Sequence, residues 1–103
     1  MIIFYNKKSG QIIGTIDGRI HPPEHLKMWV GDKKETDRLV IQWKPVKWYD
    51  EKGEEVSKTS KKVFTADFEP DCSQKELVAE IEKNPSKLYN YKVDTNNKTL
   101  IKK

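Results

Sequence analysis

The chain has 103 residues, 35% of them apolar, and a formal net charge of +4. That length suits one domain over residues 1–103 and is too short for a second core. No apolar run approaches the roughly 20 residues of a membrane-spanning helix, and the apolar start lacks the basic leader of a signal peptide. Cys72 is the only cysteine, which excludes an internal disulfide and a cysteine-rich zinc site. We therefore expect a cytoplasmic protein that has no membrane partner.

Three segments share one kind of turn chemistry, at residues 5–12, 49–56 and 93–100. In each, an apolar or aromatic residue is followed by Asn or Asp, a short polar stretch and a return to apolar residues. Asn and Asp open turns by accepting hydrogen bonds from the backbone ahead of them, and Gly or Asn can adopt the left-handed conformation that closes the loop. The pattern predicts three β-hairpins.

Alternation of apolar and polar residues between these turns is typical of half-buried strands. It is clearest at residues 39–43, where Leu39, Ile41 and Trp43 share one face. The chain is thus expected to form about six to eight strands, at residues 2–5, 11–16, 39–43, 46–49, 54–57, 63–68, 88–93 and 99–101.

Residues 21–30 are compatible with two structures. Pro22 and Pro23 suit the first turn of a short helix that would end at Gly31. Alternatively, Leu26, Met28 and Val30 could form one face of a strand. We favour the short helix.

A longer amphipathic helix is predicted at residues 73–84. Ser73 and Glu76 have the spacing of a capping box, in which each side chain accepts a hydrogen bond from the other residue's amide. Leu77, Val78 and Ile81 supply an apolar stripe, and Pro85 should end the helix. The predicted fold is therefore α+β, an antiparallel, hairpin-rich sheet with this one helix packed on it.

No catalytic motif survives closer inspection. His21, Glu24 and His25 match the H-x-x-E-H pattern of inverted zinc peptidases. That chemistry needs both imidazoles on one uninterrupted helix, which the two intervening prolines oppose. The sequence favours a non-enzymatic protein and indicates no catalytic residue, no metal, no cofactor and no small-molecule ligand.

Four neighbouring residues, Lys44, Lys47, Trp48 and Tyr49, are the candidate binding residues. Trp43 and Trp48 are five positions apart and would point to opposite faces of a straight strand. If Pro45 breaks the strand and resets the alternation, both indoles can join the core while the two lysines and Tyr49 face outward. Such a patch could hold single-stranded nucleic acid, with lysines on phosphates and a ring under a base, or could anchor a protein partner.

The charge distribution limits where a nucleic acid could bind. Residues 1–48 hold nine basic residues against five acidic ones, while residues 49–103 hold eleven of each. Most basic residues are lysine, which often serves only to solvate a surface or protect a sheet edge. We expect a protein-interaction or assembly module that acts through a sheet face or edge, with a protein partner or a second copy of the chain. The alternative is nucleic-acid binding by the N-terminal half.

Overall fold

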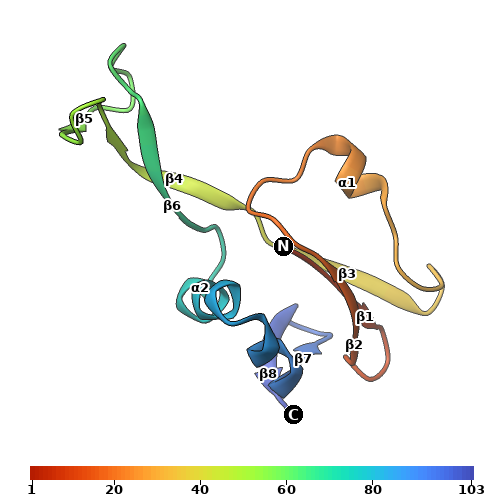
Figure 1. The fold of residues 1–103 in the computed structure, drawn as a ribbon. Coiled ribbons are helices and arrows are strands. Elements are labelled where there is room, and N and C mark those ends of the chain that lie inside the picture. The colour runs from red at the N-terminus through yellow and green to blue at the C-terminus, as the bar shows by residue number, and fades with distance from the viewer.

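A computed structural model describes the whole chain, from Met1 to Lys103. It confirms the α+β class, with eight strands in three small antiparallel sheets and a few short helices (Figure 1). No helix combines the length and the apolar character needed to cross a bilayer.

The first sheet has the order β2-β1-β3 and contains the best-buried strand. It consists of β1 (Ile2–Asn6), β2 (Ile12–Ile16) and β3 (Thr36–Val40). β1 lies between the other two strands, and residues 2–5 are all buried because other elements cover both faces of the sheet. The first predicted hairpin is confirmed, since β1 pairs with β2 across the turn at residues 7–11.

One face of this sheet is covered by the segment that contains α1 (Pro23–Lys27), which confirms the predicted short helix, although it ends at Lys27 and not at Gly31. Phe4 of β1 meets the edge of Trp29 at 5.6 Å between ring centroids. The Trp29 indole N–H donates to the Thr36 hydroxyl at 2.9 Å, which ties the segment to β3.

The opposite face packs against the C-terminal elements. These are α2 (Lys75–Lys83), the 3₁₀ helix η1 (Pro85–Asn90), β7 (Tyr91–Asp94) and β8 (Thr99–Lys102). β7 and β8 form the third predicted hairpin, which is confirmed. The main core lies between these elements and the first sheet, and its buried members are Ile3, Tyr5, Ile41, Val78, Ile81, Tyr91, Val93 and Leu100.

The remaining strands form an arm that extends away from this body (Figure 1). β4 (Trp43–Tyr49) pairs with β5 (Glu55–Val56) on one side and with β6 (Thr65–Pro70) on the other. We call residues 43–70 the arm. The molecule measures 49 × 28 × 22 Å and has a radius of gyration of 16.1 Å, whereas a compact domain of about 100 residues has about 13 Å.

The prediction of one strand at residues 39–43 was wrong. β3 ends at Val40 and β4 begins at Trp43, in a different sheet. The Ile41 side chain stays in the main core and its N–H donates to the Met1 carbonyl at 2.8 Å, whereas the Trp43 N–H donates to Arg19 at 2.8 Å. The chain therefore leaves the first sheet between these residues and enters the arm.

Two further predictions at the C-terminal half were wrong. The N-cap of α2 is Gln74, without a capping side-chain bond, so Ser73 and Glu76 form no capping box. The Gln74 amide instead bonds the backbone of Leu100, donating at 2.8 Å and accepting at 2.7 Å. Residues 88–90 belong to η1 and not to a strand, because Pro85, which ends α2 as expected, starts a new helical turn.

Candidate interaction sites

The register of the arm sorts its side chains onto two chemically different faces. Residues that lie opposite each other in an antiparallel pair point to the same face. Trp48 lies opposite both Ala66 and Val56, and Pro45 lies opposite Phe68. Phe64 continues this alternation just before β6. We call this set the apolar face, made of Trp43, Pro45, Trp48, Val56, Phe64, Ala66, Phe68 and Pro70.

The other side of the arm, which we call the polar face, carries three of the four candidate binding residues. Lys44 lies opposite Glu69, Lys47 opposite Asp67, and Tyr49 opposite Thr65 and Glu55. Trp48, the fourth candidate, points to the apolar face. The structure therefore does not bring the four residues together on one surface.

Pro45 explains why Trp43 and Trp48 share a face although they are five residues apart. The register shifts between Pro45 and Lys47, so Val46 is an extra residue in a β-bulge that resets the alternation. A proline fits there because it has no N–H to donate to the ladder. Neither indole joins the core, however, because the arm leaves the body, and Trp43 instead packs under the Arg19 guanidinium at 4.0 Å.

Two of the candidate residues on the polar face, Lys44 and Tyr49, already interact with carboxylates of the same chain. Lys44 forms an ion pair with Asp71 at 3.4 Å, and the Tyr49 hydroxyl donates to Asp67 at 2.8 Å. The pKa of Tyr49 is raised, mainly by this hydrogen bond and to a smaller extent by burial and by the nearby carboxylates. The phenol thus remains a protonated donor held by Asp67.

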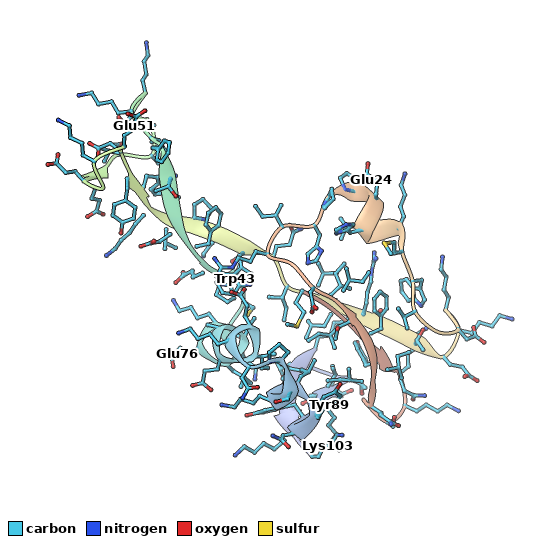
Figure 2. All side chains as sticks on the ribbon, viewed as in Figure 1. Glu24, Trp43, Glu51, Glu76, Tyr89 and Lys103 are labelled. Atoms are coloured by element: carbon cyan, nitrogen blue, oxygen red, sulfur yellow. The ribbon has the colours of Figure 1, made fainter.

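The apolar face, in contrast, is left open along the outer part of the arm. α2 lies against β6 near the base, where Trp43 is labelled, whereas Glu51 marks the distant tip (Figure 2). Phe64 is 69% exposed, whereas Trp48 and Phe68 are half-buried. A large exposed aromatic side chain on a β-ribbon face that no other element covers is typical of protein-interaction surfaces.

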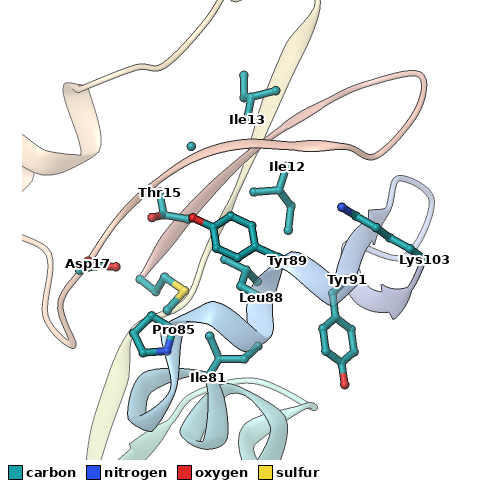
Figure 3. A pocket seen from close by; sticks show the side chains of 12 residues that line it. Ile12, Ile13, Thr15, Asp17, Ile81, Pro85, Leu88, Tyr89, Tyr91 and Lys103 are labelled. Carbon is teal, nitrogen blue, oxygen red and sulfur yellow. The ribbon is translucent and has the colours of Figure 1, made fainter.

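A second site, which the sequence analysis missed, lies beside β2 (Figure 3). A cavity of about 380 Å³ opens between this strand, α2 and η1. We call it the β2 cavity, and its apolar lining includes Met1, Ile12, Ile81, Pro85, Leu88 and Tyr89. The one sequence signal for it is the stretch at residues 11–16, which carries no charge in a chain that is 35% charged.

The two histidines of the H-x-x-E-H pattern lie side by side but not on one helix. His21 precedes α1, His25 lies within it, and their Nδ1 atoms are 3.4 Å apart. No group of three or more His, Cys, Asp or Glu side chains is arranged to hold a metal ion. His21 is only 5% exposed, and its Nε2 atom has no hydrogen-bond partner.

The environment of His21 predicts a loss of stability in mild acid. Burial first, and then the positive charges of the Met1 amine and His25, lower the pKa of His21, against the opposing effect of the Gly18 carbonyl. An unfolded histidine binds its proton near pH 6.5. The folded state is therefore at full stability above that pH and loses stability as the pH falls below it.

Urea unfolding at several pH values between about 5 and 7.5 tests this prediction. The amine of Met1, with a pKa that burial lowers to about 6, titrates in the same region, so the wild type is compared with His21→Leu. The variant should show a shallower fall in unfolding free energy towards acid. Equal slopes in the two proteins would contradict the prediction.

No protein-family model, curated protein or solved structure matches this chain.

Proposed function

We propose that this protein is a non-enzymatic interaction module whose arm docks through its apolar face on a protein partner or on a second copy of the chain. The observation that carries the proposal is the apolar face, on which the exposed Phe64 lies in line with the half-buried Trp48 and Phe68 along one side of the ribbon. Large aromatic side chains of this kind dominate the energy of protein interfaces.

The stability of the ribbon supports the same proposal. Narrow β-ribbons are marginally stable in water unless a further layer covers a hydrophobic face. The outer arm has no such layer of its own (Figure 1). A partner on the apolar face would supply the missing layer, as the second sheet does in a β-sandwich.

Charge favours a protein partner over nucleic acid. The arm holds six lysines and six carboxylates, so it carries no net positive charge with which to attract phosphates. Lys44 and Lys47 of the polar face each lie opposite a carboxylate. Nucleic-acid binding through Lys44, Lys47 and Tyr49 is thus the weaker candidate.

A matched pair of arm variants tests the proposal. Phe64→Asp places a charge on the apolar face, while Thr65→Asp places the same charge on the next residue, which belongs to the polar face. Both positions are exposed, so both variants should fold. The tagged proteins are compared by quantitative affinity capture from the source cell and by sedimentation equilibrium.

We expect a specific protein, or dimer formation, to be lost in Phe64→Asp and kept in Thr65→Asp. A monomer that captures no specific protein would overturn the proposal. Oligonucleotide titrations test the nucleic-acid alternative. The proposal would also be overturned if the wild type binds an oligonucleotide with a log affinity that falls linearly with log salt concentration, and if the double variant Lys44→Glu, Lys47→Glu binds it more weakly.

A further inference from the structure

β2 leaves one edge of the first sheet unpaired. It is the outer strand in the order β2-β1-β3. Residues 12–16 make ladder hydrogen bonds with β1 alone, and none of their backbone groups bonds a loop, a turn or a side chain. Half of the backbone groups of such an edge strand are thus available to another chain.

The β2 edge also lacks the features that usually block an edge. Proteins protect exposed edges with charged residues or proline. The other outer strand, β3, carries Asp37 and Arg38, whereas the sequence of β2 is Ile-Ile-Gly-Thr-Ile, without charge or proline. Although the chain has twenty basic residues, none of them lies in β2 to block the pairing of another strand with this edge.

The β2 cavity lies directly beside this edge. Ile12 and Thr15 of β2 line it on one side, and Ile81, Pro85 and Leu88 line it on the other. A strand added to β2 would run past this opening, and every second side chain would face the cavity. Apolar pockets that take alternate side chains give strand addition its specificity.

A second, lysine-lined hollow adjoins the β2 cavity, and Tyr89, Tyr91 and Lys103 line both. The Tyr89 ring is 79% exposed and lies across the cavity mouth (Figure 3). The second hollow has a volume of about 490 Å³ and is lined by Lys87, Lys102 and Lys103 together with Tyr89, Asn90 and Tyr91. Lys87 is paired with Glu80, so Lys102 and Lys103 are the two lysines left to meet a ligand. A ligand that spans both hollows needs an apolar group followed by negative charge.

We propose that the β2 edge binds an extended acidic peptide segment of a partner protein, which adds to the sheet as a fourth strand. Its backbone bonds the free edge of β2, an apolar side chain fills the β2 cavity beside Tyr89, and its carboxylates face Lys102 and Lys103 of the neighbouring hollow. This site is separate from the apolar face of the arm and does not depend on the function proposed for it.

The test begins with a displayed library of random twelve-residue peptides, selected against the full chain. We expect the enriched peptides to combine apolar residues with nearby Asp or Glu. A synthetic peptide of the enriched sequence should slow hydrogen exchange at the amides of residues 12–16, because strand addition bonds backbone groups that are otherwise free.

Matched variants then locate the peptide. Tyr89→Ala and the double variant Lys102→Glu, Lys103→Glu should each weaken binding by about tenfold or more. The double variant Lys61→Glu, Lys62→Glu makes the same charge change on exposed residues of the arm and should bind normally, as should Phe64→Asp. Circular dichroism verifies that each variant is folded.

Three results would overturn the inference. The library could enrich no peptide, the bound peptide could leave exchange in β2 unchanged, or both lysine double variants could lose binding equally, which would show a general charge effect. Because Phe64→Asp is included, loss of the arm function and loss of the peptide site are told apart.

Discussion

Replacing Gly10 with alanine is expected to lower the free energy of unfolding by about 3 kcal/mol or more. Gly10 has a φ of +76°, and a Cβ atom there would lie 2.0 Å from the carbonyl oxygen of Val93. That carbonyl belongs to the backbone of β7 and cannot rotate away as a side chain would. The Val93 N–H also donates to Gly10 at 2.8 Å, so any shift weakens the junction between the first hairpin and β7.

Gly53 provides the matched control for this prediction. Its φ of +80° is almost the same, but no atom lies within 4 Å of the Cβ that alanine would add. Gly53→Ala should therefore cost only the left-handed strain, about 1–2 kcal/mol. Urea unfolding followed by circular dichroism compares the two variants with the wild type. Equal losses would mean that the contact with Val93 is not tight in solution.

Phe4→Ala is expected to destabilise the protein by about 3–5 kcal/mol, because it removes a large aromatic ring from a buried site. Phe4 is 0% exposed, and its ring meets Trp29 edge to face, which links β1 to the segment that contains α1. The loss should also loosen this segment, so the tryptophan fluorescence of the folded variant, to which Trp29 contributes with Trp43 and Trp48, is expected to change.

Phe64 allows the same substitution to be tested at the surface. Because its ring is 69% exposed on the arm, Phe64→Ala should change stability by no more than about 0.5 kcal/mol. Thermal unfolding and urea unfolding of both variants check the difference. If the wild type is a monomer by sedimentation, a loss at Phe64 comparable to that at Phe4 would show that the arm packs on the body, and this would remove the basis for docking through the apolar face.

The sequence predicted the hairpin turns and the end of α2 correctly, because interactions between neighbouring residues determine these features. The Asn and Asp turns placed all three hairpins correctly, since these side chains accept hydrogen bonds from amides only two or three residues ahead, as Asn6, Asp50 and Asp94 do. Pro85 likewise ended α2 where it was expected to. Such interactions are complete within one turn and need no distant partner.

Where a distant partner competes, the local pattern predicted the wrong structure. The capping box at Ser73 is absent because the neighbouring Gln74 bonds Leu100, which is 26 residues away. The alternation at residues 39–43 is real, but Ile41 belongs to the main core while Trp43 begins the arm. A periodic pattern states that residues share a face and does not state in which sheet they lie.

The candidate sites also combine features that neighbouring residues determine with features that distant residues determine. The sequence by itself identified Pro45 as the residue at which the alternation of the arm can be reset, because proline cannot donate to a ladder, and the structure has a bulge there that puts Trp43 and Trp48 on one face. Only the tertiary structure decided that the outer apolar face is left uncovered, and that β2 presents a free edge beside a cavity built from η1 and α2. The physical reason is that alternation encodes the direction of a side chain, whereas its burial depends on which distant element packs against it.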